Sequence, residues 1–508
     1  MALAWERSSG LCRTRPATAF RGSTLPAHVT SRQTYLLAGL VLAGAIARFA
    51  TLDLQGFPHD EAVTAGRVLD GSFGEAMDQV MEGERTPPLY YAIAWLWAQP
   101  FGLGEVGLRS LSALVGTLMI PAAFLLGREL ASTRTGLIGA ALVALNPILV
   151  WYSQEARSYI LMALLVTVAM IFFARGMRRP EPRSLAPWAV FSALALCSHY
   201  FAIFLIAPQA ILLLLASRNR AVVYACGGLS AVVLALGLVA LEQQGEDRRD
   251  GYTDRSLASR VAEVGVDYVA GEEPDPLSAS TRVDAVQVGA GFAGSVLFAG
   301  AVVLLSRGPP HEREAGLWMG AILVAAVGVP ALAALVGLDF LKPRNVMAGV
   351  VPVLMIAALG FSSERAARAG LLGAIGMSAL FAASLIATNV SAEMQREDWR
   401  SAAGAAGAPA GTRLIAVPQN GDDPLLYYLD ATRFVGPVAR DGAVVDEIVA
   451  ISTTSEINPP PEGFELVSTE RVPPLFTVST FQASGPERVE RADAVSLLRE
   501  RATVLLDE

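Results

Sequence analysis

Charged residues are scarce in this chain of 508 residues, at 17% of the composition, whereas hydrophobic residues make up 53%. With a mean hydropathy of +0.45, the chain is too apolar for a soluble multidomain protein and too long for one hydrophobic core. Cysteine is also rare: Cys12, Cys197 and Cys226 occur without a CxxC pair or a Cys/His cluster. We therefore expect no disulfide framework, no zinc site and no thiol redox chemistry.

An excess of positive charge is lacking too. The 39 Lys and Arg residues against 47 Asp and Glu residues give a net charge of −8, and no basic patch interleaved with aromatic residues occurs. Both observations argue against a nucleic-acid partner. The sequence also has no P-loop, no DxD motif in a soluble catalytic domain and no internal repeat of fixed period. It therefore supplies no nucleotide or nucleotide-sugar site.

What the chain does have is long apolar runs. Eleven are candidate membrane spans, near residues 33–51, 106–127, 136–152, 158–174, 185–198, 201–217, 221–241, 285–306, 315–338, 345–361 and 369–389. Because a bilayer core needs about 20 apolar residues per helix, 185–198 is short. The run at 87–102 is shorter still between its prolines, and we expect it to lie in the membrane interface. The sequence predicts a polytopic α-helical membrane protein.

Arginine distribution sets the expected topology. With 87–102 in the interface, the arginines of every short loop fall on the side of the Arg-rich tail at 1–32, in agreement with the positive-inside rule: Arg128, Arg134, Arg175, Arg178, Arg179, Arg183, Arg218, Arg220, Arg307, Arg313, Arg365 and Arg368. The tail is then cytosolic and the protein multi-pass in the plasma membrane. The opposite, external face receives 52–105, 153–157, the His199–Tyr200 turn, 242–284, 339–345 and everything after 390.

The composition changes near residue 390. Helix-like segments at 397–408 and 422–430 alternate with short apolar strands at 412–418, 446–453 and 475–483, separated by loops rich in Gly and Pro. We expect three parts: a cytosolic tail (1–32), a transmembrane module (33–389) with a first external loop at 52–105, and a small soluble α/β domain outside the cytoplasm (390–508).

Three charged groups lie on the predicted external face. Asp60 and Glu61 follow the first span, Glu155 and Arg157 follow another, and Lys342 and Arg344 precede a third. Charges at helix ends commonly mark the interface only. Acids and bases gathered on one face are also what a site for an anionic lipid and a hydroxyl acceptor needs. Adjacent helical residues diverge by about 100°, so we expect only one acid of the Asp60–Glu61 pair to act as a base.

The order of motifs resembles a known superfamily. "HDEA" at 59, "ERTPPLYYAIAWLWAQPFGLGEVGLRSLSALVG" from 84, "GLIGAALVALNPILVWYSQEARSY" from 136 and "KPRN" at 342 resemble the polyprenyl-phosphate-sugar-dependent glycosyltransferases of the GT-C fold. The subgroup looks like family 39, which includes protein O-mannosyltransferases and the aminoarabinose transferases of lipid A. The likeness is dense over 50–175 and thin after 220, apart from Arg344.

The resemblance implies residue roles. The first acid of the pair, Asp60, maps to the active centre, and Arg344 maps to the position that holds the lipid phosphate. The family often has a basic residue directly before the PPL turn, where this chain has Thr86; Arg85, one step earlier, is the candidate substitute, with Lys342 as a further phosphate ligand. Candidates for acceptor binding or active-site support are His59, Glu61, Glu155, Arg157, Tyr159 and His199.

The implied reaction moves a sugar, mannose or a pentose, from a polyprenyl-phosphate carrier to a hydroxyl of a glycan, lipid or protein acceptor, with inversion. No metal site is indicated, although a divalent ion is compatible with the chemistry. Two alternatives remain at this point: a transporter or flippase of lipid-linked sugars, and a non-catalytic anchor for the external domain. A transporter is expected to place polar residues near the bilayer midplane and to show repeated halves, whereas the charges here lie at helix ends.

Overall fold

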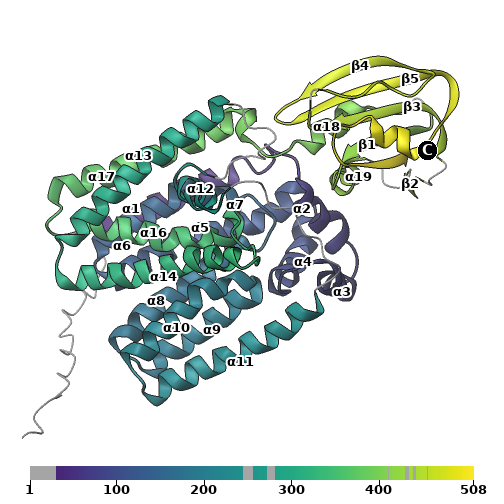
Figure 1. Ribbon diagram of the computed structural model, residues 1–508. Coiled ribbons are helices and arrows are strands. Elements are labelled where there is room, and N and C mark those ends of the chain that lie inside the picture. Colours follow the sequence, from purple (N-terminus) through teal and green to yellow (C-terminus); the bar gives the residue numbers. More distant parts are fainter. Residues whose placement is uncertain are drawn as a thin grey trace, which may run out of the picture.

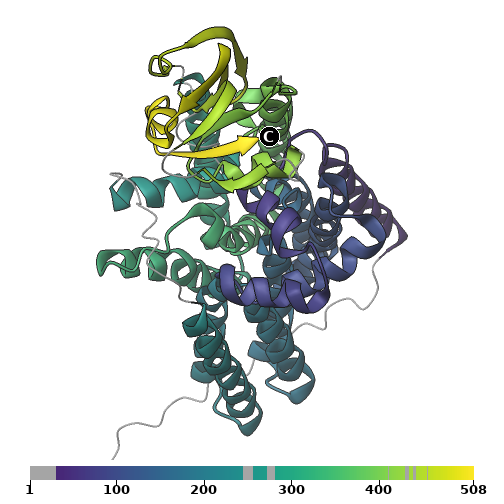
Figure 2. The same ribbon diagram turned by 90° about the vertical axis from the view of Figure 1, so that its right-hand side faces the viewer.

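The computed structural model of the chain describes residues 30–243, 256–271, 281–409, 411–429, 434–438, 442–454 and 456–507. A bundle of helices forms the larger part, and a small sheet lies at one end of it (Figures 1 and 2). Nearly all of the predicted cytosolic tail lies outside the described residues, as do residues 244–255 and 272–280 of the predicted loop at 242–284. The described part of that loop consists mainly of one helix, α12.

The helices of the bundle have the following bounds: α1 Ser31–Phe49, α2 His59–Val63, η1 Thr64–Val68, α3 Phe73–Gly83, α4 Leu89–Phe101, α5 Glu105–Leu130, α6 Thr133–Leu145, α7 Pro147–Ser153, α8 Tyr159–Arg178, α9 Pro182–Ser198, η2 Tyr200–Ala202, α10 Ile203–Ala216, α11 Arg220–Glu242, α12 Leu257–Ala270, α13 Thr281–Ser306, α14 Pro310–Leu335, α15 Pro343–Val346, η3 Met347–Gly349, α16 Val350–Ser362 and α17 Ala367–Val390. The C-terminal part contains η4 Ala392–Met394, α18 Trp399–Ala406, β1 Arg413–Pro418, α19 Asp422–Tyr428, β2 Phe434–Pro437, β3 Ala443–Ser452, β4 Phe464–Val472, β5 Phe476–Val489, α20 Arg491–Ser496 and β6 Ala502–Asp507.

All eleven predicted spans are helical, and the predicted fold class is confirmed. Seven helices among the described residues are long and apolar enough to cross a bilayer, and an eighth span results if the bent pair α6–α7 is counted as one. The other predicted spans correspond to α1, α9 and α10. These helices are shorter or carry arginines near their ends, so length and composition alone do not make them spans.

A buried arginine stabilises the bend between α6 and α7. Asn146 and Pro147 interrupt the helix there, at an angle of 59°. Arg48, at the end of α1 and fully buried, donates to the carbonyls of Val143 and Ala144 at distances of 3.0 and 2.9 Å. These carbonyls belong to the last turn of α6, which has no helical partners for them. The cation thus replaces the backbone donors that the bend removes.

The predicted first external loop, 52–105, folds into short helices. Ser72 and Glu75 form a capping box at the start of α3, and the indole of Trp95 in α4 donates to the carbonyl of Gly71 at 3.1 Å. The core helix of the predicted interfacial run, α4, has 13 residues. That is below the roughly 20 residues of a bilayer span.

The C-terminal part is a six-stranded sheet in the order β2-β6-β1-β3-β5-β4. The pair β1–β3 is parallel and the other neighbours are antiparallel. Alternate residues of β1 and β3 face α18 and α19 on one side and α20 on the other, so both central strands are buried. The helices and strands predicted at 397–408, 412–418, 422–430, 446–453 and 475–483 are confirmed. The sequence reasoning missed β2, β4, β6 and α20.

The expected interfacial position of 87–102 can be tested by cysteine labelling. Gly104 is exposed, and nothing lies within 4 Å of a Cβ added there, so we expect Gly104→Cys to fold normally. In a background with the three native cysteines replaced by alanine, a membrane-impermeant maleimide should label this cysteine in intact cells. Arg307→Cys, in a predicted cytosolic loop, is the matched control that should react only after permeabilisation. A Gly104→Cys variant that reacts only after permeabilisation would show that 87–102 crosses the bilayer.

Candidate active site

Asp60 and Arg344 meet at the end of the bundle that carries the C-terminal domain. The carboxylate of Asp60, in the first turn of α2, accepts a hydrogen bond from Nη1 of Arg344 at 2.9 Å. The two residues are 284 positions apart in the chain. Their side chains are 37% and 40% exposed, so a ligand can reach both. Two of the three charged groups singled out in the sequence thus form one site.

The surrounding cations decide the protonation state of Asp60. Burial alone raises the pKa of this carboxyl, but the charges of Arg157 and Arg344, followed by those of His59 and Lys342, outweigh burial and hold the pKa below its ordinary value. The sequence alone predicts that desolvation raises the proton affinity of a carboxylate at this position. The structure gives the opposite direction in the ligand-free state, because several cations converge on one acid.

Glu61 has a different environment from its neighbour. Its side chain is fully buried and forms a two-pronged ion pair with Arg109 of α5, at 3.0 and 2.6 Å. One of its oxygens also accepts the backbone N–H of Ala156 at 2.6 Å. The Arg109 guanidinium donates in addition to three carbonyls of residues 52–57, which we call the approach segment: those of Leu52, Gln55 and Gly56. Glu61 therefore points away from the Asp60 site and fixes the loop.

Arg157 lies behind Asp60 and connects it to Glu84 and Tyr91, which lie further along the predicted first external loop. Its guanidinium pairs with Glu84 at 3.2 and 3.0 Å and donates to Thr64 Oγ1 at 3.1 Å. Tyr91 in turn donates to Glu84 at 2.6 Å, and the guanidinium of Arg157 lies 5.8 Å from the centre of the Tyr91 ring. Burial lowers the pKa of Arg157, but Tyr91, Glu84 and Asp60 outweigh burial and raise it, so the group stays a cation. It is positioned to support the Asp60 carboxylate rather than to pair with it directly.

The segment that carries Arg344 is held by α12. Arg260 of α12 forms an ion pair with Asp339, with one contact at 2.9 Å, and donates to the carbonyl of Leu341 at 3.0 Å. Further along, α12 brings Tyr268, whose hydroxyl donates to the carbonyl of Val346 at 2.5 Å. Pro343 occupies the first turn of α15, where a missing N–H costs nothing. These contacts bracket Arg344 and set its direction.

Two aromatic candidates form a wall of the site. Tyr159 and His199 are buried, and their ring centres lie 5.3 Å apart. Burial, reinforced by Arg157 and Arg344, lowers the pKa of His199 to about 3, so the imidazole is neutral. Its Nδ1 accepts the backbone N–H of Phe201 at 3.2 Å, which leaves the proton on Nε2. His199 can therefore donate a hydrogen bond but cannot supply a charge.

The remaining candidates lie further out. His59 faces the C-terminal domain, with Nδ1 at 4.0 Å from Asp423, and Glu155 pairs with Arg396 at 3.3 Å. Lys342 is half-buried and contributes charge at Asp60. Arg85 is exposed and has no ion pair within the described part of the chain, while the preceding residue, Glu84, points into the site.

Sequence reasoning missed Arg109, Glu84 and Tyr91. A signal existed for Arg109, because an arginine inside the apolar run 106–127 is costly in a membrane and marks a functional or structural partner. Glu84 and Tyr91 carry no such signal, since an acid and a tyrosine in a predicted external loop are ordinary. Over the described ranges no group of three His, Cys, Asp or Glu side chains gathers as potential metal ligands.

Comparison with known proteins identifies the fold. Residues 85–241 match the family model described as dolichyl-phosphate-mannose-protein mannosyltransferase. ArnT from Cupriavidus metallidurans in the apo state is similar in structure, with a TM-score of 0.56 and 14% identity over 89% of this chain and 98% of that one. The same protein bound to undecaprenyl phosphate gives 0.53 and 13% over the same shares. No curated protein matches in sequence. The predicted resemblance to the GT-C fold is confirmed.

The buried position of Glu61 leads to a stability prediction. Removing its charge in Glu61→Gln leaves Arg109 without a counter-ion among buried groups, and breaking such a pair costs about 3–5 kcal/mol. We expect a clear drop in the thermal unfolding midpoint of the purified protein. Glu82→Gln, at an exposed position of α3, is the matched control and should unfold like the parent. Unchanged unfolding of Glu61→Gln would mean that the ion pair contributes little to the fold.

Proposed function

We propose that this protein is a membrane glycosyltransferase that moves a sugar from a polyprenyl-phosphate carrier to an acceptor hydroxyl. The observation that supports the proposal most directly is the Asp60–Arg344 pair, in which an acid and a guanidinium suited to a phosphate lie 2.9 Å apart and open to ligand. The structurally similar ArnT binds undecaprenyl phosphate, and the family model at 85–241 is named for dolichyl-phosphate-mannose. Both molecules are polyprenol-type lipids that carry a phosphate, which is the donor class proposed for this chain.

The two groups have complementary roles in the proposed step. Asp60 is the general base that orients the acceptor hydroxyl and takes its proton. Arg344, with Lys342, binds the donor phosphate, because a guanidinium fork matches phosphate oxygens. Arg157, which lies behind Asp60, keeps a positive charge close to Asp60 and Arg344. His199 and Tyr159 line the site as uncharged partners for sugar or acceptor hydroxyls.

The reaction is a single displacement. The acceptor oxygen forms a bond to the anomeric carbon as the bond between that carbon and the phosphate oxygen breaks, and the acceptor proton passes to Asp60. The electron pair of the broken bond remains on the polyprenyl phosphate, where Arg344 and Lys342 stabilise the developing charge. One displacement inverts the configuration at the sugar. General-base assistance of this kind contributes about 10²–10⁴ in rate.

Donor binding changes the base strength of Asp60. In the ligand-free structure Arg344 bonds to Asp60 and holds its pKa low. A phosphate that attracts Arg344 competes for the same guanidinium and neutralises part of its charge. With less positive charge opposing it, burial then raises the pKa of Asp60, and the carboxylate becomes a better proton acceptor. Binding of the donor phosphodiester therefore raises the base strength of Asp60 before the donor reacts.

The proposed cellular arrangement rests on the arginine pattern. We propose that 33–389 is the catalytic transmembrane module, that 390–508 and the site lie outside the cytoplasm, and that the protein resides in the plasma membrane with 1–32 inside. The acceptor then approaches from the aqueous side and the donor from the outer leaflet. The alternative of a transporter has less support, because the charged groups cluster at one end of the bundle.

A direct assay tests the function. The purified protein is incubated with a panel of polyprenyl-phosphate sugars, including mannose and arabinose carriers, and with a cell-envelope extract as the source of acceptors. We expect one donor to yield free polyprenyl phosphate and a sugar-labelled product by mass analysis. Failure to consume any donor, together with movement of the intact lipid across vesicle membranes, would favour the transporter instead.

Asp60→Asn is expected to abolish transfer. The substitution keeps size and hydrogen-bonding shape but removes the proton acceptor, so turnover should fall on the order of 10²-fold or more, with donor binding largely retained. Asp70→Asn, at an exposed position after η1, is the matched control and should transfer at the parental rate. Parental turnover in Asp60→Asn would assign the base to another residue.

Arg344→Ala is expected to change both donor use and the pH profile. Loss of the guanidinium should raise the donor KM, and Arg344→Lys should recover only part because a point charge cannot form the bidentate contact. Activity of a carboxylate base is lost as pH falls through its pKa. Removing Arg344 raises that pKa, so the acid limb of kcat/KM should move to higher pH. Arg307→Ala, exposed in a predicted cytosolic loop, serves as the control. An unchanged acid limb in Arg344→Ala would show that Arg344 does not control the pKa of the catalytic base.

A further inference from the structure

The C-terminal domain contacts the transmembrane module at the approach segment, immediately before Asp60. Tyr428, in the last turn of α19, accepts the backbone N–H of Phe57 at 2.5 Å and donates to Oε1 of Glu105, the first residue of α5. Arg400 of α18 pairs with the other oxygen of Glu105 at 2.8 Å and donates to the carbonyl of Asp53 at 3.0 Å. The Glu105 carboxylate thus accepts hydrogen bonds from Tyr428 and Arg400, and both of these side chains also bond to the approach segment.

Further contacts extend the junction on both sides. The backbone N–H of Arg396, in the connection between α17 and α18, donates to Gln55 Oε1 at 2.8 Å. The fully buried ring of Phe57 lies between the C-terminal domain and the helix bundle. Its centre is 5.2 Å from the centre of the Tyr427 ring of α19 and 5.0 Å from the Arg109 guanidinium of α5. Phe57 precedes Asp60 by three residues, so a displacement here is passed to the carboxylate.

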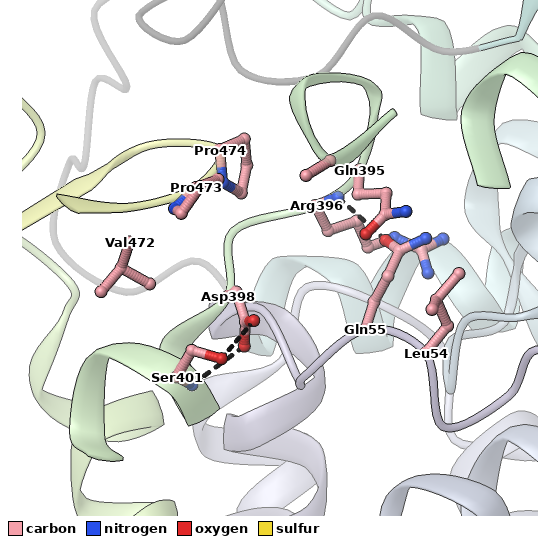
Figure 3. Close-up of a pocket in the computed structure, with 10 residues that line it drawn as sticks. Leu54, Gln55, Gln395, Arg396, Asp398, Ser401, Val472, Pro473 and Pro474 are labelled. Atoms are coloured by element: carbon pink, nitrogen blue, oxygen red, sulfur yellow. Dashed lines mark hydrogen bonds between the residues drawn. The ribbon is translucent and has the colours of Figure 1, made fainter. Parts of the chain in front are cut away.

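The contact is made by helices and the connection rather than by the sheet. Between the approach segment, the connection and the β4–β5 turn lies a cavity of about 210 Å³ whose lining includes Gln55, Arg396 and Pro474 (Figure 3). The turn with Pro473 and Pro474 faces the approach segment across this space. The hydrogen bonds of α18 and α19 therefore determine how the domain sits on the approach segment.

We propose that the C-terminal domain positions the catalytic carboxylate: Tyr428 and Arg400, joined through Glu105, fix the approach segment from one side while Arg109 fixes it from the other. The inference rests on the proposed role of Asp60. Tyr428 and Arg400 are positioning residues, since neither touches Asp60 or Arg344. Burial and the Glu105 carboxylate raise the pKa of Tyr428, so the hydroxyl keeps the proton that it donates while its oxygen accepts from Phe57.

The physical reason lies in the geometry of the approach segment. It has no helix or strand assignment, so its backbone groups depend on side chains from elsewhere. α2 has five residues and continues directly into the five residues of η1, which together are too few to be stable alone. A segment of this kind adopts one position only when it is bound on both sides. Because a shift of about 1 Å at a reacting group can cost about 100-fold in rate, the C-terminal contacts matter for catalysis.

Hydrogen exchange tests the positioning without requiring activity. In full-length protein, Tyr428→Phe keeps the ring but removes both hydrogen bonds of the hydroxyl. Peptides covering 53–61 should exchange about tenfold faster, whereas peptides from α8 and β3 should be unchanged. Tyr224→Phe, at an exposed position of α11, is the matched control. Unchanged protection of 53–61 in Tyr428→Phe would overturn the proposal whatever the protein catalyses.

Kinetics test whether the effect passes through Asp60. Tyr428→Phe should lower kcat about 10- to 100-fold with donor KM within about twofold, and Arg400→Lys should retain more activity than Arg400→Met. In an Asp60→Asn background the tyrosine change should cost nothing further, because the group that it positions is already gone. Additive losses would show general destabilisation and overturn the proposal. A parent protein that transfers no sugar would refute the proposed function, and the exchange result would still decide the positioning.

Discussion

The buried ion pair between Glu61 and Arg109 is the interaction on which the site depends. Removing two charges from water costs several kcal/mol per ion, and the cost is recovered only when every donor and acceptor finds a partner. Here the guanidinium bonds to both carboxylate oxygens and to carbonyls of residues 52, 55 and 56, and Glu61 accepts one more N–H from residue 156. Because such a network tolerates little displacement, it locks α2, α5 and the α7–α8 turn together.

Adjacent acids have acquired opposite environments as a result. Glu61 is removed from water and neutralised by one arginine, whereas Asp60 stays accessible and lies among cations of the α7–α8 turn and α15, chiefly Arg157 and Arg344. The divergence of about 100° between neighbouring helical residues makes this separation possible. Anchoring by Glu61 also explains why so short a helix can hold Asp60 in place.

Local patterns predicted much of the fold but only part of the site. Apolar runs and strand alternation are properties of neighbouring residues, so the spans and the central strands β1, β3 and β5 were predictable. β4 is mostly exposed and β2 has four residues, so neither carries a strong signal. The separate roles of Asp60 and Arg344 came from the family resemblance, but their direct pairing was not predicted, because no local pattern connects positions so distant. Glu84, Tyr428 and Arg400 escaped prediction for the same reason, and the direction of the Asp60 pKa required a count of surrounding cations.

The strand order of the sheet has a consequence for biosynthesis. β6, residues 502–507, lies between β2 and β1 and pairs with β1 along its whole length, and its Asp507 neutralises the buried Arg413 of β1 at 2.7 Å. β1 leads directly into α19, which carries Tyr428. Residues 52–61 leave the ribosome long before 502–507 are made, so the nascent chain contains every charged group of the site while the sheet is still open. We therefore expect the approach segment to reach its final position only when β6 closes the sheet that carries α19.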